Sequence, residues 1–180
     1  MKHGKGKLYY NNNSIKYEGD FIDDKFEGNG KYIWEDGEYY IGQWLNDLRN
    51  GKGKKYYKNG NIKYECNFVD GKRQGFGKFI WEDGEIYIGQ WLDGLKHGKG
   101  KLYYKNGDIK YDGDFIKDKF EGNGIYIYEN GNYYSGQWLN GLKHGKGKLY
   151  YKNGKIKCEG EFVNGVFQGK CIIYFTKQYI

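Results

Sequence analysis

The chain contains no proline, one methionine and three cysteines among its 180 residues, and it has no long apolar run. The absence of proline excludes collagen-like and polyproline structures, which depend on that residue. No stretch approaches the roughly 20 consecutive apolar residues that a membrane-spanning helix needs. Three cysteines without a CxxC spacing do not make a disulfide framework and favour a reducing compartment. The opening residues Met1–Gly4 do not resemble a signal peptide, so we expect an intracellular, cytoplasmic protein.

Glycine and aromatic residues are abundant instead. Glycine occurs 31 times, which is more than twice the average usage of about 7%. Aromatic residues make up 20% of the chain, and this content excludes ordinary disorder because disordered segments are poor in aromatics. The formal net charge of +7 favours attraction to anionic surfaces.

The motif Tyr-x-Gly-x-Trp/Phe recurs along the whole sequence. It starts at residues 17, 40, 64, 87, 111 and 134, and once more at 158, where Cys158 replaces the tyrosine. The spacings alternate between 23 and 24 residues, so the true period is a pair of 47 residues. We therefore expect a single repeat domain over residues 1–180, with a half-unit at 1–16, full units beginning at those seven positions and no interdomain linker.

Each unit contains two short runs in which aromatic and β-branched residues alternate with polar ones. Asn-Gly or Asp-Gly pairs bound these runs, as at Asn106-Gly107 and Asp36-Gly37. Alternation with period two between such turns indicates strands joined in hairpins, and we find no amphipathic helical stretch. The predicted fold is all-β: an elongated, single-layer antiparallel β-meander of repeated hairpins with about 15 strands at roughly 4.8 Å spacing.

The alternation of 23 and 24 residues predicts two kinds of connection. A two-residue Asn106-Gly107 turn would pair Leu102 with Tyr111, whereas a three-residue loop at 35–37 would pair Tyr32 with Tyr40. Both connections keep equivalent side chains on the same face. A slip of one residue would move every side chain to the opposite face, so this agreement supports the register.

The predicted pairs place three rows on one face of the sheet. A row of large residues runs beside an almost pure glycine row, and a third row alternates aromatics with glycine. Glycines would leave a trough that neighbouring rings cover. Lys55 interrupts the large row and Cys66 interrupts the glycine row. Representative members of the three rows are Tyr40, Gly42 and Trp44, then Tyr87, Gly89 and Trp91, then Tyr134, Gly136 and Trp138.

These residues resemble the MORN-repeat family, whose pattern is Tyr-x-Gly-x-Trp/Phe-x-x-Gly-x-x-His/Glu-Gly-x-Gly. Seven units and the N-terminal half-unit carry the resemblance. Asp24, Asp47 and Asp118 stand where the pattern has its loop glycine, and aspartate tolerates the left-handed conformation. The resemblance implies a rod-like sheet that serves as a non-catalytic scaffold, as in cytoskeletal proteins of protists. It also allows a lipid-binding module, or a regulatory region of a larger enzyme such as a phosphatidylinositol phosphate kinase.

Lysines gather on the face opposite the aromatics, and the net charge of successive units alternates in sign. They are candidates for binding an anionic phospholipid such as a phosphoinositide, because each lysine near such a membrane can contribute about 1 kcal/mol. Most of them oppose acids in the predicted register, for example Lys54 opposite Glu65, so cross-strand pairing is the interpretation we favour. The candidate lipid-binding or anion-binding residues are Lys52, Lys54, Lys99, Lys101, Lys146 and Lys148.

The same face also carries apolar side chains, and exposed apolar patches often mark interfaces. The candidate protein-binding residues are Ile33, Ile41, Ile80, Ile88, Ile125, Ile127, Tyr103 and Tyr150. An open sheet also has free edges that can pair with another chain. We expect the C-terminal edge, at Ile172, Ile173, Tyr174 and Phe175, to pair either with a second copy in a homodimer or with more chain.

The sequence offers no cofactor site and no catalytic set. His3, His97 and His144 occupy one repeat position 47 residues apart, so strand spacing would separate neighbours by about 19 Å, too far for a shared metal. The segment 94–100 has the wrong spacing for a phosphate loop. Lysines and aromatics on opposite faces argue against nucleic acid. We therefore expect a scaffold that binds other proteins, with contact to an anionic membrane as the alternative.

Overall fold

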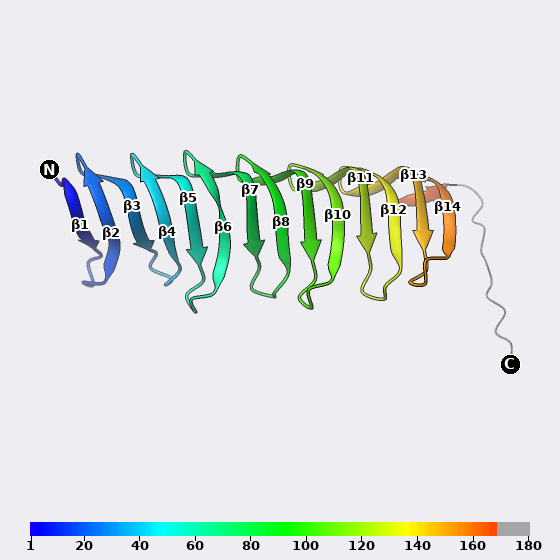
Figure 1. The fold of residues 1–180 in the computed structure, drawn as a ribbon, viewed down its shortest axis with the longest axis horizontal. Helices are drawn as coiled ribbons and strands as arrows, with labels where there is room; N and C mark the ends of the chain where they lie inside the picture. Colours follow the sequence, from blue (N-terminus) through cyan, green and yellow to red (C-terminus); the bar gives the residue numbers. More distant parts are fainter. Residues whose placement is uncertain (169–180) are drawn as a thin grey trace. The chain divides into compact units, whose positions relative to one another are not determined.

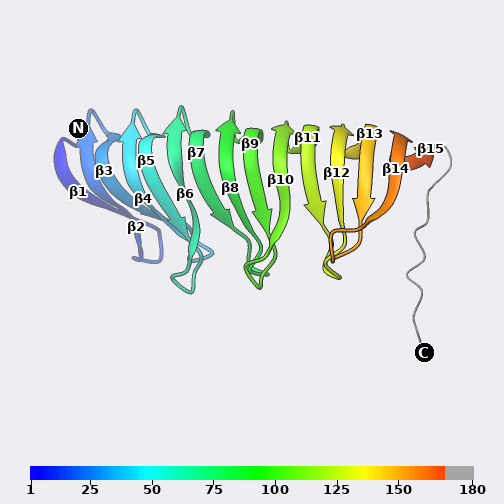
Figure 2. The same ribbon diagram turned by 45° about the vertical axis from the view of Figure 1, so that its right-hand side comes forward.

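The computed structural model describes residues 1–168, which form strands and turns without a helix. The sheet has 15 strands that follow one another in chain order as antiparallel hairpins, open at both edges (Figures 1 and 2). This confirms the predicted all-β meander. The strands are β1 (Gly4–Tyr9), β2 (Ile15–Ile22), β3 (Lys25–Ile33), β4 (Tyr39–Leu45), β5 (Leu48–Tyr56), β6 (Ile62–Val69), β7 (Lys72–Ile80), β8 (Ile86–Leu92), β9 (Leu95–Tyr103), β10 (Ile109–Ile116), β11 (Lys119–Ile127), β12 (Tyr133–Leu139), β13 (Leu142–Tyr150), β14 (Ile156–Val163) and β15 (Val166–Gln168).

Two compact units divide the chain, Met1–Leu95 and Lys96–Ile180. Strands β1–β8 belong to the first unit, and the second contains nearly all of β9 and the strands after it. The assignment of residues 1–180 to a single domain therefore stays a prediction. The predicted dimer edge at Ile172, Ile173, Tyr174 and Phe175 lies outside the described residues.

Tight two-residue turns close the hairpins at one end of the strands. Asp24, Asp47 and Asp118 occupy the second turn position with φ of 67°, 68° and 68°, as the sequence predicted. The backbone N–H of that position then donates to a carbonyl of the preceding hairpin, as from Gly71 to Arg49 over 2.9 Å. These left-handed residues therefore close one hairpin and attach it to its neighbour.

Three-residue loops close the hairpins at the other end. The loop between Trp34 and Glu38 has the predicted form. The predicted two-residue Asn106-Gly107 turn is wrong, because Tyr104 and Asp108 flank a three-residue loop of the same kind. The extra residue is absorbed as a bulge at Lys110, so Leu102 still pairs with Tyr111.

The bulged residue is a lysine each time, and its ammonium lies over the ring of a loop tyrosine. Lys63 Nζ lies 4.8 Å from the centroid of the Tyr57 ring, and Lys16 and Lys110 are placed in the same way over Tyr10 and Tyr104. A cation over an aromatic face is stabilised by the ring quadrupole. The bulge therefore aims a lysine at the adjacent loop.

The core consists of tyrosine rings that cover paired glycines, on the side of the sheet here called the aromatic face. Tyr17 is fully buried. A Cβ atom added to Gly19 would lie 2.5 Å from the Tyr17 hydroxyl oxygen and 2.6 Å from Cα of Gly30, the cross-strand partner of Gly19. The predicted glycine trough is thus confirmed. The equivalent tyrosines Tyr40, Tyr87, Tyr111 and Tyr134 are also fully buried.

Each of these tyrosine hydroxyls donates to the backbone carbonyl three residues later. Tyr87 donates to Gln90 over 2.8 Å and Tyr134 to Gln137 over 2.9 Å. The preceding glycine of the Gly-x-Gly motif has another role, because Gly28 and Gly122 have φ of 60° and 61° and lie at register shifts. The tyrosine thus reaches a carbonyl beside a bulge that the sequence did not predict.

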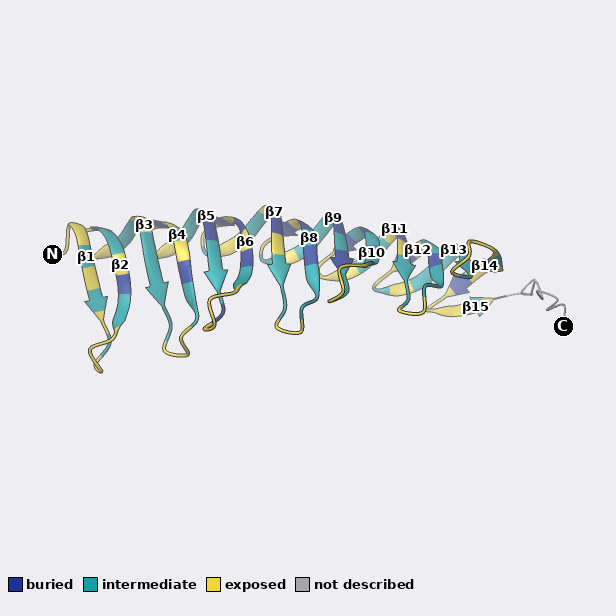
Figure 3. Ribbon diagram, turned by 60° about the horizontal axis from the view of Figure 1, so that its bottom comes forward, coloured by how far each residue is buried: buried dark blue, intermediate teal, exposed yellow. Residues whose placement is uncertain are grey.

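Burial follows the rows within each unit, with exposed residues concentrated in the turns (Figure 3). The predicted third row is correct only across the three-residue-loop hairpins and their equivalents, where Gly28 pairs with Trp44 and Gly98 with Phe115. Across the tight turns it is wrong, because the bulge places Phe26 instead of Gly28 opposite Phe21. The core of the first unit contains Tyr17, Phe21, Tyr40, Trp44, Tyr64, Cys66 and Phe68. In the second unit the buried apolar residues include Leu102, Tyr111, Phe115, Tyr134, Trp138, Cys158 and Phe162.

Substitution Gly113→Val should destabilise the sheet. The added carbon would lie 2.6 Å from the Tyr111 hydroxyl oxygen and 2.7 Å from Gly124 Cα, and overpacking of this kind costs about 1–3 kcal/mol. Urea denaturation measures the loss. Ser135→Val on the opposite face is the control, and equal unfolding free energies for both variants would contradict the trough.

Alkaline pH should unfold the protein as the buried tyrosines ionise. Burial, and to a lesser degree nearby carboxylates, raises the pKa of Tyr17 to about 12, and burial raises the pKa of Tyr134 to about 12. An unfolded tyrosine ionises near pH 10. The stability linked to these hydroxyls is therefore complete below about pH 10 and lost as the pH rises through 12. Phenolate absorbance measured alongside circular dichroism should show these tyrosines ionising together with unfolding.

Candidate functional site

The face opposite the tyrosine rings, here called the lysine face, carries rows of cross-strand ion pairs. Four of the six predicted lysines contact a carboxylate, as the register required. Lys99 pairs with Asp114 over 2.7 Å and Lys101 with Asp112 over 2.8 Å. The other two pairs are Lys54 with Glu65 at 3.1 Å and Lys148 with Glu159 at 3.0 Å.

Lys52 and Lys146 are exposed and differ from these four. Lys146 lies opposite Glu161, but no ion pair joins them among the described residues. Lys52 lies opposite Asn67, which carries no charge. The backbone N–H of Lys52 donates to Gln43 Oε1 over 2.9 Å, which fixes its bulge and leaves the ammonium in solvent. Lys52 is therefore a cationic group that faces an amide rather than an acid.

A hollow of about 670 Å³ opens on the lysine face over β4–β7. Ile41 and Phe76 contribute apolar surface to it, and they are 45% and 67% exposed. Phe76 was not among the predicted binding residues. Comparing the chain with itself would have found it, since Asn29 and Asn123 occupy the equivalent positions. Its polar lining includes Lys52, Lys54, Glu65, Asn67 and Lys78.

The other predicted apolar residues do not form one patch. Ile125 is 41% exposed and lines a separate, smaller hollow of the second unit with Lys99 and Asp112. Three isoleucines contribute backbone carbonyls that accept hydrogen bonds from loop tyrosines, as when Tyr57 donates to Ile80 over 2.8 Å. The half-buried members of the predicted set are Ile33, Ile80, Ile88, Ile127, Tyr103 and Tyr150.

A second apolar feature follows the tight turns and was also missed. Leucine or valine pairs flank several turns, such as Leu45 with Leu48 and Leu139 with Leu142. All four are exposed, although each belongs to a regular strand end. The signal was present in the sequence as aliphatic residues on both sides of Asn-Asp, Asp-Gly and Asn-Gly pairs. These side chains are spread along the turns instead of forming one patch.

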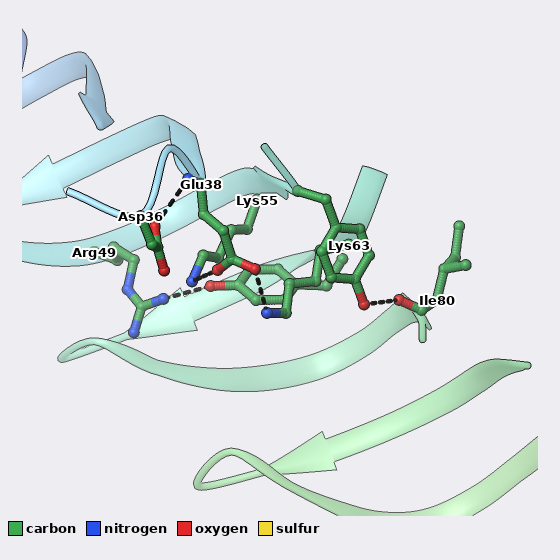
Figure 4. A network of polar contacts seen from close by, with 8 residues as sticks. Asp36, Glu38, Arg49, Lys55, Lys63 and Ile80 are labelled. Atoms are coloured by element: carbon green, nitrogen blue, oxygen red, sulfur yellow. Dashed lines mark hydrogen bonds and ion pairs between the residues drawn. The ribbon is translucent and has the colours of Figure 1, made fainter. Parts of the chain in front are cut away.

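On the aromatic face, a polar network surrounds Glu38 (Figure 4). Its carboxylate contacts Lys55 Nζ at 2.5 Å and Lys63 Nζ at 2.6 Å, and its side chain is only 14% exposed. Burial disfavours the charged carboxylate, but hydrogen bonds from Lys55 and Lys63 outweigh that effect and lower the pKa of Glu38. Lys55 also lies 4.2 Å from the Trp34 ring centroid. The lysine that interrupts the row of large residues is thus paired on two sides.

Within residues 1–168, no three His, Cys, Asp or Glu side chains are grouped so that they could hold a metal ion. The same residues contain no helix long and apolar enough to cross a membrane. The cysteine thiol of Cys66 is buried, and burial raises its pKa to about 12. A thiol with so high a pKa stays protonated near neutral pH and is a poor nucleophile.

The comparison with protein families matches the MORN repeat at 17–39, 40–62, 64–86, 87–109, 111–133, 134–156 and 158–178, and a MORN repeat variant at 2–23. Together these matches cover most of the chain. The chain belongs to the MORN-repeat family. MORN repeats are a non-catalytic repeat type and generally bind proteins or membranes. A comparison with curated proteins gives no match.

On the aromatic face, the third MORN unit, residues 64–86, differs from the first and fifth units at Cys66 and Arg73. Cys66 replaces the trough glycine, so Tyr64 has no flat floor to cover. Its hydroxyl instead accepts a hydrogen bond from Arg49 Nη1 over 2.5 Å. Arg73 replaces the phenylalanine that stacks on the repeat tyrosine in the first and fifth units, as Phe26 does on Tyr17 at 3.8 Å.

The guanidinium of Arg73 lies 4.0 Å from the ring centroid of Trp91. The Trp91 ring nitrogen is buried and has no hydrogen-bond partner among the described residues. In contrast, Trp44 and Trp138 donate to the carbonyls of Gly30 and Gly124 over 3.2 Å. Stacking of Arg73 on Trp91 therefore takes the place of the hydrogen bond that the tryptophan donates in the second and sixth MORN units.

Removal of the Glu38 charge should destabilise this MORN sheet at neutral pH. Glu38→Gln leaves the poorly exposed ammonium groups of Lys55 and Lys63 without a carboxylate, and such a loss costs about 1–3 kcal/mol. Because the folded pKa of Glu38 is lowered, the stability is present above the ordinary value of 4.5 and lost as pH falls through the folded value. The difference in urea stability between wild type and variant should therefore shrink below that pH.

Glu85→Gln is the matched control, because Glu85 lies 47 residues later and Leu102 stands in place of Lys55. Its effect should be smaller. An equal loss for both variants, or a Glu38→Gln difference that persists into acid, would contradict the role given to the Lys55 pair.

Proposed function

We propose that this chain is a non-catalytic docking module that associates with other proteins through its lysine face. The observation that supports this most is that the lysine face neutralises most of its own charge and yet exposes an apolar ring. Lys54, Lys99, Lys101 and Lys148 each pair with a carboxylate of the same sheet, while Phe76 on the same face remains largely exposed. A paired lysine has less charge to offer a membrane, and an exposed aromatic ring is a typical anchor of protein interfaces.

The buried ionisable side chains support the non-catalytic part of this proposal. The buried tyrosines and Cys66 have raised pKa values, so they are less easily ionised than free side chains. Any catalytic role would belong to chain outside this sheet. The same docking role accommodates self-association, with a second copy of the chain as the partner.

Co-sedimentation with vesicles tests the proposal against its lipid alternative. Vesicles that contain phosphoinositide should not retain the protein at physiological salt, because exposed charges are screened beyond a Debye length of about 8 Å. Neutral phosphatidylcholine vesicles and the variant Lys99/Lys101/Lys146/Lys148→Ala are the controls. Binding that survives physiological salt and disappears in the alanine variant would make membrane docking the function instead.

Photo-cross-linking tests directly whether proteins dock at this face. A benzoylphenylalanine at position 76 should give discrete adducts with protein partners in an extract of the source cells, and the same residue at position 29, where Asn29 is equivalent, should not. Identical adduct patterns at both positions would argue against a localised docking site.

A further inference from the structure

The repeat provides an internal reference for the hollow over β4–β7. At the residue directly after the trough position, the first and fifth units carry Asp20 and Asp114, whereas the third unit carries Asn67. Phe76 likewise replaces the asparagine found at positions 29 and 123. The hollow therefore departs from the repeat on two strands, β6 and β7. Asn67 and Phe76 line this hollow together.

The first departure leaves a lysine without an acid opposite it. Lys99 contacts Asp114 at 2.7 Å, and Lys52 holds the equivalent place opposite Asn67. Glu65 is the one carboxylate in the described lining of the hollow, and Lys54 already contacts it at 3.1 Å. With Lys52, Lys54 and Lys78 around this single acid, the lining has an excess of positive charge.

The second departure gives the hollow an apolar floor. Phe76 has the most exposed aromatic side chain within residues 1–168. Ile41 lines the same hollow. Tyr56 completes this surface and is held in place by stacking on Tyr39, with ring centroids 4.6 Å apart. The volume of about 670 Å³ lies within the usual range for a site that takes one small ligand or a few side chains.

Building on the docking function above, we propose that this hollow binds an acidic peptide segment of a partner protein, with one bulky apolar side chain among its carboxylates. The apolar side chain packs against Phe76 and Ile41. The carboxylates of the segment pair with Lys52 and Lys78, which line the hollow from β5 and β7. Charge complementarity selects the acidic segment, and the exposed ring selects the apolar residue.

Two variants that restore the repeat test the two halves of this proposal separately. Phe76→Asn installs the residue found at positions 29 and 123. Asn67→Asp installs the residue found at positions 20 and 114, where Asp20 Oδ2 accepts the backbone N–H of Asn29 over 3.3 Å. Both variants should fold, because the same residues already occupy the same bulges elsewhere in the sheet. Unchanged thermal melting checks this.

The experiment is a selection from a random dodecapeptide display library on the full chain, with the Phe76→Asn/Asn67→Asp double variant as counter-selection. Enriched peptides should be rich in Asp and Glu around a Leu, Ile, Phe or Trp. Fluorescence anisotropy of an enriched peptide should then show at least about a tenfold weaker affinity for Phe76→Asn. Asn67→Asp should weaken binding and reduce its salt dependence, because Lys52 gains a carboxylate partner.

Asn123→Phe is the matched control for the ring. It places a phenylalanine in the second unit beside Asp112, where Asp114 already pairs with Lys99. It should not gain affinity for the acidic peptide. A gain equal to the wild-type site would show that an exposed ring suffices and would overturn the charge selection.

Neutral or basic enriched peptides, or peptides that bind the double variant equally, would overturn the inference. A selection that returns nothing over the counter-selection would do the same. In these cases, adducts at position 76 would still support protein docking, so the two proposals fail separately. Binding of anionic vesicles or single-stranded nucleic acid that depends on Phe76 and competes with the peptide would also overturn the assignment to a peptide.

Discussion

The close approach of a tyrosine ring to two paired glycines is the contact on which the rest of this sheet depends. A single layer has no second sheet to cover its apolar side, and the tyrosine supplies that cover from within the layer. The ring of Tyr111 fills the space above Gly113 and Gly124, and its hydroxyl donates to the carbonyl of Asp114 over 3.1 Å. One side chain therefore buries apolar surface and satisfies a backbone acceptor at the same bulge.

The consequences reach the opposite face. Because the tyrosines need the trough, the glycine register is fixed, and with it the register of the lysines and acids on the other side. Lys101 meets Asp112 for the same reason that Gly100 meets Gly113. The charge pattern of the surface is thus set by packing in the core, and a departure such as Asn67 stands out against it.

Sequence reasoning predicted the strand pairing well because aromatic periodicity and left-handed turn residues are local signals. The pairs Tyr32 with Tyr40 and Leu102 with Tyr111 follow from counting residues between turns. The bulges at Gly28 and Lys110 were not predicted, because the extra residues are left unpaired and the pairing beyond them is kept, as between Leu102 and Tyr111. The three-residue loop at Tyr104–Asp108 was missed for that reason.

The candidate site was predicted only in part. Ile41, Lys52 and Lys54 were named from the sequence, and they line the hollow. Phe76 was missed because a phenylalanine in an alternating strand reads as core until its parity is checked against the neighbouring repeats. The Glu38 network was missed because Glu38 lies in a loop whereas Lys55 and Lys63 come from β5 and β6, and no local pattern links them.

The lysine bulges have a consequence for how such a chain can change its length. The loops that begin at Tyr10, Tyr57 and Tyr104 combine a bulged lysine over the tyrosine ring with a hydroxyl that reaches the end of the strand after next, as Tyr10 reaches the carbonyl of Ile33 over 2.9 Å. Loss of a single unit of 23 or 24 residues would place two loops of the same kind next to each other. A tyrosine hydroxyl would then no longer meet the strand end that accepts its hydrogen bond. Duplication and deletion in evolution should therefore proceed in steps of 47 residues, the smallest segment whose two ends match.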